Sequence, residues 1–128
     1  MAKQADFELK KAFMELQLKM VETGEKIQII DSQIDVLHRV LNHVDITQRE
    51  ISTLPPGTKT YEPVGRMFLL TDLGEVKSNL KTRESQLTAR FTELENNKKY
   101  LEKNLKESED NIREMVQHKK EQSETKLN

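Results

Sequence analysis

The sequence predicts a mostly α fold: a long antiparallel two-helix coiled coil whose helices are joined by a short β-hairpin. In both halves of the 128-residue chain, apolar residues recur at steps of four and three, which is the seam of a coiled coil. A short stretch containing Pro55, Pro56 and Gly57 separates the halves and cannot be helical. Strand-forming residues follow this stretch, so a β element is expected at the connection.

The first helix is predicted over residues 5–45. Thr23 is the polar exception in its seam, and the adjacent Gly24 costs about 1 kcal/mol relative to alanine in a helix interior. The apolar period resumes in phase beyond Gly24, so we expect the helix to continue through it. The seam consists of Leu9, Phe13, Leu16, Met20, Thr23, Ile27, Ile30, Ile34, Leu37, Leu41 and Val44.

The second helix is predicted over residues 73–118. Asp72 and Glu75 have the spacing of a capping box, which marks a helix N-terminus. Residues 119–128 are polar and are expected to form a frayed tail. The seam consists of Val76, Leu80, Arg83, Leu87, Phe91, Leu94, Lys98, Leu101, Leu105, Ser108, Ile112 and Met115. Because the two helices have similar lengths, they can pair as an antiparallel hairpin.

Residues 46–72 are predicted to contain a short helical turn followed by the β-hairpin. Thr47 and Glu50 form a second capping-box pattern, which suggests a separate turn that the prolines close. A tight turn is expected at Val64 and Gly65, between two strand-like stretches. Pro63 is expected at an edge or in the turn, because proline donates no N–H to a ladder.

The second strand of this hairpin is apolar on both faces. Met67 and Leu69 point to one face, and Phe68 and Leu70 point to the other. An isolated two-stranded hairpin is marginal in water and has unpaired edges. We therefore expect hairpins from several chains to pair edge to edge and close into a β-barrel. The alternative is a small core that folds back onto the helices of the same chain. The predicted assembly residues are Tyr61, Val64, Gly65, Arg66, Met67, Phe68, Leu69 and Leu70.

The composition argues against several classes of protein. Net charge is -1, with both signs interspersed, so the signature of a nucleic-acid-binding protein is weak. The chain has no cysteine and therefore no disulfide framework. It also has no apolar run of about 18 residues and no apolar signal region at its start. We expect a cytoplasmic protein that binds neither membrane nor nucleic acid.

No motif in the sequence indicates catalysis, a cofactor or a metal. His38 and His43 are about 140° apart around a helix, so they do not form the spacing that metal sites use. His118 lies far along the chain. A phosphate-binding loop and a nucleophile elbow are also missing from the sequence. We expect a protein that is not an enzyme.

The chain resembles β-type prefoldin subunits over nearly its whole length, as a single domain of residues 1–128. One hairpin, rather than two, is the β-type pattern, and Pro63 is a local departure from it. The residues that carry the resemblance are Leu9-Lys-Lys-Ala-Phe13, Tyr61-Glu-Pro-Val-Gly-Arg-Met-Phe68 and Ser108-Glu-Asp-Asn-Ile-Arg-Glu-Met115.

This resemblance implies a heterohexamer of two α-type and four β-type subunits. In the family, two barrels form a body from which six coiled coils project, and the assembly uses no ATP. It captures unfolded proteins, chiefly actin and tubulin, between the ends of the coiled coils. It then passes them to the cytosolic chaperonin. The expected partners are therefore other prefoldin subunits, unfolded clients and that chaperonin.

Client capture requires apolar side chains outside the seam, at the free end of the coiled coil. Phe7, Met14, Leu18 and Val21 meet this requirement, and flexible methionine suits promiscuous binding. The alternative is that these residues only widen the packed stripe or cover the end of the second helix. The predicted client-contact residues are Phe7, Phe13, Met14, Leu18, Met115 and Val116.

Two other functions are compatible with a helical hairpin. A structural tether or scaffold subunit needs no apolar residues between Tyr61 and Leu70 and has no affinity for unfolded protein. A nucleic-acid-binding helical hairpin needs a basic stripe, which this sequence lacks. We therefore favour the chaperone subunit and keep the tether as its alternative.

Overall fold

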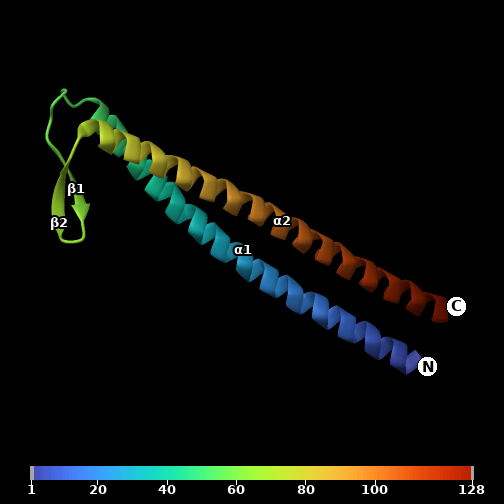
Figure 1. Ribbon diagram of the computed structural model, residues 1–128. Coiled ribbons are helices and arrows are strands. Elements are labelled where there is room, and N and C mark those ends of the chain that lie inside the picture. Colours follow the sequence, from blue (N-terminus) through green and yellow to red (C-terminus); the bar gives the residue numbers. More distant parts are fainter. Residues whose placement is uncertain (1, 128) are drawn as a thin grey trace. The chain divides into compact units, whose positions relative to one another are not determined.

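A computed structural model describes residues 2–127 of the chain. Its elements, in chain order, are α1 (Ala2–Ser52), β1 (Thr60–Val64), β2 (Met67–Thr71) and α2 (Leu73–Leu127) (Figure 1). Two long helices joined by a short antiparallel β-hairpin confirm the predicted fold. The chain divides into two compact units, and both helices contribute to each. Unit 1 lies within Met1–Asp31 and Asn96–Asn128, and unit 2 is Ser32–Glu95.

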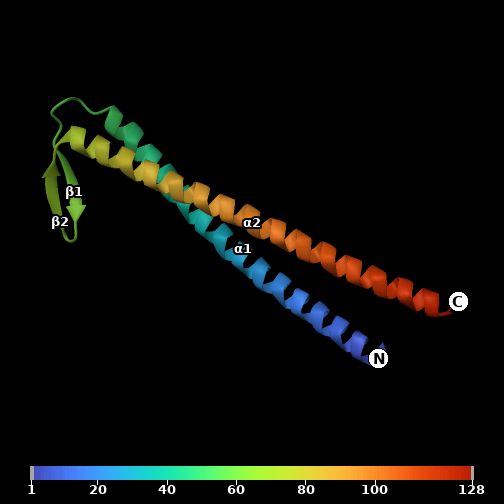
Figure 2. The ribbon, with the colours of Figure 1, turned by 45° about the vertical axis from the view of Figure 1, so that its right-hand side comes forward.

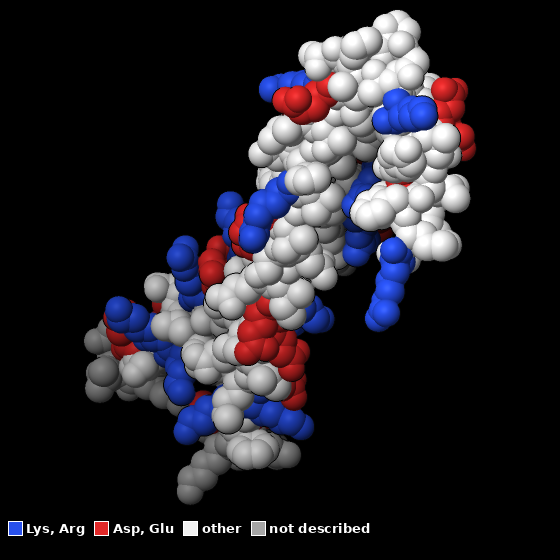
Figure 3. All heavy atoms as spheres, turned by 90° about the vertical axis from the view of Figure 1, so that its left-hand side faces the viewer, with Lys and Arg blue, Asp and Glu red and all other residues white. Residues whose placement is uncertain are grey.

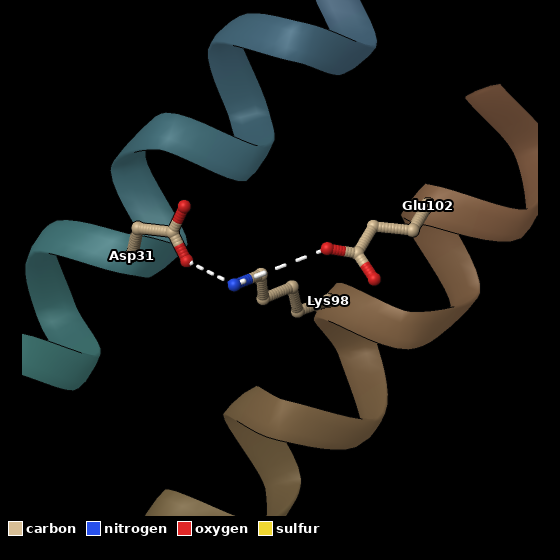
Figure 4. Close-up of polar contacts among 3 residues, drawn as sticks. All are labelled: Asp31, Lys98 and Glu102. Carbon is tan, nitrogen blue, oxygen red and sulfur yellow. Dashed lines mark ion pairs between the residues drawn. The ribbon is translucent and has the colours of Figure 1, made fainter.

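In unit 1, the seam residues are the least exposed side chains of their helices. Thr23, Ile30 and Ser108 are buried, so the polar seam residues Thr23 and Ser108 face inward as the period predicts. The half-buried members are Leu9, Phe13, Leu16, Met20, Ile27, Lys98, Leu101, Leu105, Ile112 and Met115. Lys98 forms an ion pair with Asp31 of α1 (Figure 4). Asp31 lies about one helical turn beyond the seam residue Ile27 of α1.

In unit 2, the same inward row holds the helices beside the hairpin. Val44, Val76 and Leu94 are buried. The rings of His38 and Phe91 meet edge to face, with 4.8 Å between centroids and an interplanar angle of 71°. Such T-shaped pairs add about 0.5–1.5 kcal/mol beyond the buried area. The remaining half-buried seam members are Ile34, Leu37, Leu41, Leu80 and Leu87, whereas Arg83 is exposed.

The end of α1 differs from its prediction. The helix continues without interruption to Ser52, so the separate helical turn expected after residue 45 does not exist. Thr47 Oγ1 donates to the carbonyl of His43 at 2.8 Å, which is a bond within a helix and not an N-cap. The helix stops where Leu54 precedes Pro55, because the residue before a proline disfavours the α conformation. A tightened last turn precedes this stop, with Leu54 N–H donating to the carbonyl of Ile51 at 3.1 Å.

The outer ends of both helices also extend beyond the predicted limits. α1 begins at Ala2, and α2 continues to Leu127, so the predicted frayed tail is helical over residues 119–127. Residue 128 lies outside the described part. Lysine, glutamate and glutamine, which dominate this stretch, are good helix formers without any apolar pattern. Within it, Thr125 Oγ1 donates to the carbonyl of Glu121 at 2.8 Å.

The turn of the β-hairpin lies one residue later than predicted. Val64 pairs with Met67, so Gly65 and Arg66 form a two-residue loop. Gly65 has φ of +62°, and no other described residue except Gly57 has a positive φ. A glycine at the first loop position followed by a residue of negative φ is the pattern of a type II′ turn. Pro63 consequently lies inside β1, paired with Phe68.

Side-chain bonds fix this hairpin within unit 2. Glu62 Oε1 accepts a hydrogen bond from Asn79 Nδ2 of α2 at 3.2 Å. Thr60 Oγ1 donates to the carbonyl of Thr71, which is buried next to the start of α2. In the two views of Figures 1 and 2, β1 lies on the side of the helices and β2 on the side away from them. β1 therefore lies nearer to the helices than β2 does, and its side chains Tyr61 and Val64 are still more than half exposed.

Candidate functional site

The first candidate surface is the β-hairpin of unit 2. Phe68 is 75% exposed, and its neighbours in β2 are each more than half exposed. Figure 3 views this end of unit 2 and shows largely uncharged surface over it. The exposed apolar residues of the hairpin are Tyr61, Val64, Met67, Phe68, Leu69 and Leu70. Together with Gly65 and Arg66, whose positions the turn defines, they are the residues predicted to mediate assembly.

The register explains why both faces of the hairpin are apolar. Directly opposite residues point to the same face of an antiparallel pair. Tyr61 and Leu70 therefore share one face with Pro63 and Phe68, and Val64 and Met67 share the other. Complete burial of a Leu, Met or Phe side chain contributes roughly 1.5–3 kcal/mol. The four apolar residues of β2 thus leave several kcal/mol of burial unrealised, which favours a surface that another protein covers.

The second candidate surface is an open groove in unit 1, which we call the large groove. It has a volume of about 1220 Å³. Phe7, Met14, Leu18 and Val21 reach it from α1, and each is more than half exposed. The complete lining is Phe7, Lys10, Lys11, Met14, Glu15, Gln17, Leu18, Met20, Val21, Glu109, Ile112 and Arg113.

A small groove, of about 290 Å³, lies beside it in the same unit. Phe13 and Met115 are half-buried seam residues, and each contributes an edge to this groove. Met14 lines both grooves, so the two surfaces are continuous at this side chain. The complete lining is Leu9, Lys10, Phe13, Met14, Met115, Val116 and Lys119. The six predicted client-contact residues are thus distributed over two adjoining grooves of one unit.

Several residues of these grooves are not apparent from the sequence. Met20 and Ile112 are seam residues, yet each also forms part of the wall of the large groove. Val21, which the sequence already placed outside the seam, continues the stripe of Phe7, Met14 and Leu18 at helical spacing. Charged residues complete the walls: Lys10, Lys11, Glu15, Glu109 and Arg113 line the large groove, and Lys10 and Lys119 line the small groove.

The side chains of these surfaces suit the binding of apolar groups. Apolar walls with methionine at their junction can adapt to different apolar segments. Among the described residues, no group of three or more His, Cys, Asp or Glu side chains could hold a metal ion. No described helix is long and apolar enough to cross a membrane.

Comparison with known proteins identifies the fold and its lineage. A family model described as prefoldin subunit matches residues 14–119. The chain belongs to the prefoldin subunit family. The matched region contains the hairpin and most residues of the two grooves, although Phe7 and Phe13 precede it. Membership implies assembly with other prefoldin subunits in a chaperone complex.

Individual prefoldin proteins are similar to this chain. Prefoldin subunit 1 of Danio rerio is 48% identical over 89 residues, which cover 70% of this chain and 71% of that protein. Prefoldin subunit 1 of Homo sapiens is 44% identical over 84 residues, covering 66% and 69% respectively. The crystal structure of the prefoldin beta subunit from Thermococcus strain KS-1 has a TM-score of 0.76. It covers 80% of this chain and 90% of that chain at 22% identity, so it supports the fold alone.

Proposed function

We propose that this chain is one subunit of an ATP-independent heterohexameric prefoldin that captures unfolded proteins. In this proposal, the hairpin joins other α-type and β-type subunits in a β-barrel, and the grooves of unit 1 bind the client. The observation that carries the proposal is the exposure of Phe7, Met14, Leu18 and Val21 along one groove. A helix that served only to pair with its partner would bury its apolar residues in the seam.

The chemistry of the large groove matches an unfolded client. An unfolded chain exposes apolar side chains in no fixed geometry, so its receptor must be apolar, open and adaptable. Phe7 supplies a rigid aromatic surface, and Met14 is 67% exposed and has three rotatable side-chain bonds. The lysines and Arg113 in the walls can bind acidic or carbonyl groups beside an apolar segment.

Weak individual grooves become effective when several of them act together. A groove of this kind binds a short apolar segment weakly, because ordering the segment costs free energy. A complex that holds several subunits at fixed spacing converts later contacts into intramolecular events. Overall affinity can then exceed that of one groove by about 10²–10⁴ without any new contact. Assembly through the hairpin is therefore part of the capture mechanism.

Delivery to a chaperonin completes the proposed role. The clients are of the actin and tubulin class, the acceptor is the cytosolic chaperonin, and the complex works in the cytoplasm. These details follow the family resemblance of the central motif around Tyr61 and Phe68. They are tested by transfer of a labelled unfolded actin from the reconstituted complex to purified chaperonin. Capture without transfer would reject the delivery step and leave the holdase role intact.

A triple substitution tests capture directly. The variant Phe7→Gln, Met14→Gln, Leu18→Gln is assembled into the heterohexamer, and suppression of aggregation of a denatured client is measured by light scattering. We expect at least a several-fold loss of suppression, because the wall of the large groove becomes polar. The complex should keep its mass, because these side chains lie outside the seam and the hairpin.

A matched control separates the groove from general surface hydrophobicity. Ile29, Val36 and Tyr100 are also more than half exposed, and they line neither groove of unit 1. Changing these three residues to glutamine should leave suppression unchanged. Equal loss in both variants would reject the groove as the binding site. Absence of suppression even by the wild-type complex would favour the structural tether.

A further inference from the structure

A groove in unit 2 has a basic rim and an apolar floor, and we call it the hairpin groove. Its volume is about 570 Å³. On α1, Arg39, His43 and Thr47 recur every four residues, so they lie along one face of the helix. Among the described residues, no Asp or Glu lines this groove. The complete lining is Arg39, Val40, His43, Val44, Thr47, Pro63, Leu80 and Arg83.

The floor of the hairpin groove is apolar and open to another chain. Val44 is buried, Val40 and Leu80 are half-buried, and Pro63 of β1 is exposed. The volume of the groove is within the range of pockets that hold small ligands, so a few side chains are enough to fill it. A short segment with at least one apolar side chain therefore fits this site.

Arg83, on the rim, occupies a seam position of α2 where the period requires an apolar residue. Lys98 also occupies a seam position, but Asp31 lies 2.6 Å from its Nζ and offsets part of the cost of that charge. Arg83 forms no ion pair within the described part of the chain. Its charge in the seam therefore has no compensating carboxylate in this subunit.

Arg39, the other arginine of the rim, also forms no ion pair within residues 2–127. Asp45, which lies further along α1, pairs with Arg49 at 2.8 Å instead. A guanidinium group can donate two parallel N–H bonds to one carboxylate, and such charged bonds are stronger than neutral ones. Two unused guanidinium groups beside an apolar floor complement a segment that carries carboxylates and an apolar side chain.

The place of the hairpin groove indicates which protein supplies this segment. Pro63 belongs both to the groove and to β1, the strand that begins the hairpin. In a closed β-barrel both edges of the hairpin are paired, so a strand of another subunit lies against β1. The residues that flank this neighbouring strand are then close to the groove.

We propose that the hairpin groove binds an acidic segment of a neighbouring prefoldin subunit. Carboxylates of that segment pair with Arg39 and Arg83, and an apolar side chain packs on Val40, Val44 and Leu80. This inference rests on the proposed assembly through the hairpin and adds a contact outside the barrel. Strand pairing uses backbone atoms that all subunits share, whereas a pair of arginines discriminates between neighbours by their charge.

Zero-length crosslinking identifies the occupant. The variant Arg39→Lys, Arg83→Lys keeps both charges and introduces an amine at each position. It is assembled into the heterohexamer with an unfolded client present and treated with a carbodiimide. The reagent joins an amine to a carboxylate that touches it, as an amide, and takes up the water that is lost. We expect mass spectrometry to find positions 39 and 83 joined to Asp or Glu of another prefoldin subunit.

Charge reversal measures how much the contact contributes. For Arg39→Glu, Arg83→Glu, we expect the subunit concentration at half-assembly to rise at least about tenfold at low salt. The matched control is Lys77→Glu, Lys81→Glu, which reverses two exposed charges of unit 2 outside the groove. This control should change the half-assembly concentration by less than about twofold.

The results that would overturn the inference are distinct from those that reject the proposed function. Crosslinks from positions 39 and 83 to the client alone, or to no other protein in a complex of correct mass, would overturn it and leave the proposed function standing. Equal effects of the two charge reversals, or unchanged assembly of the arginine variant, would do the same. Failure of the wild-type chain to enter any complex would overturn the proposed function and this inference with it.

Discussion

Lys98 of α2 and Asp31 of α1 form an ion pair inside unit 1, with 2.6 Å between Nζ and Oδ1 (Figure 4). Lys98 occupies a seam position, where the period requires an apolar residue. Glu102, one turn further along α2, lies 3.9 Å from the same Nζ. A charged residue in the seam costs stability and, in return, favours the alignment in which its partner is available.

Replacing Lys98 should therefore stabilise the protein. In Lys98→Leu, an apolar side chain fills the seam and no charge is desolvated, so we expect the free energy of unfolding to rise by about 1 kcal/mol. Asp31→Ala should lower it by less than about 1 kcal/mol, because the pair is partly exposed and screened by salt. Urea unfolding at low and high salt measures both effects.

A double-mutant cycle gives the control for this pair. In the Lys98→Leu background, Asp31→Ala should have little effect, because its partner is already absent. A large loss in that background would show that Asp31 contributes mainly through other contacts.

Gly24 should be a removable weak point of α1. Glycine in a helix interior costs about 1 kcal/mol relative to alanine. A Cβ added at Gly24 would meet no atom within 4 Å, so Gly24→Ala adds no clash. We expect the melting temperature of the Gly24→Ala variant to be several degrees higher than that of the wild type, as measured by circular dichroism.

Gly65→Ala is the contrasting control for this substitution. Gly65 has φ of +62°, a conformation that costs an L residue roughly 1–2 kcal/mol, so the melting temperature should fall. An unchanged or lower melting temperature for Gly24→Ala would indicate that this glycine has a role beyond the helix backbone.

The sequence predicted the inward row of both helices because hydrophobic periodicity records which residues are buried. Its errors concern features that periodicity does not record. Thr47 and Glu50 have capping-box spacing, but the same spacing also occurs inside a helix, where Thr47 bonds to His43. Residues 119–127 lack an apolar pattern, yet their helix propensity is high.

For the candidate surfaces too, some features could be predicted from the sequence and others could not. The exposure of Phe68 could be predicted, because an alternating strand with two apolar faces cannot bury both within so short a hairpin. The walls of the large groove could not be predicted in full. Arg113 of α2 lines it together with Lys11 of α1, and a pattern along one helix does not reveal which exposed residues of two helices share a surface.

Phe68→Asp should abolish assembly without unfolding the isolated chain. The side chain is 75% exposed, so its loss should change the free energy of unfolding by no more than about 0.5 kcal/mol. In a covered apolar interface, a carboxylate would be desolvated without a partner. Native mass spectrometry of the reconstituted mixture should show this subunit missing from the complex.

Tyr100→Asp provides a matched charge change at an exposed apolar residue of unit 1. Tyr100 is 63% exposed and lies outside the hairpin, so this variant should assemble normally. Incorporation of Phe68→Asp at the wild-type level would remove the hairpin from the assembly surface and favour an intrachain role.

Pro63→Val should make the chain prone to associate with itself. Pro63 is paired with Phe68 at a non-bonded position, so the ladder of the hairpin loses nothing when valine replaces it. Valine restores an outward N–H on β1 and has a higher strand propensity, so this edge gains the donor that proline removes. Sedimentation velocity over a range of concentrations should show greater self-association than in the wild type. Lys59→Val is the control, because it adds an apolar side chain at an exposed residue just before β1 and changes no backbone donor of the ladder. Equal association of both variants would assign the effect to hydrophobicity. No association of Pro63→Val would show that the missing donor does not protect this edge, and that the contact of β1 with the helices is sufficient to protect it.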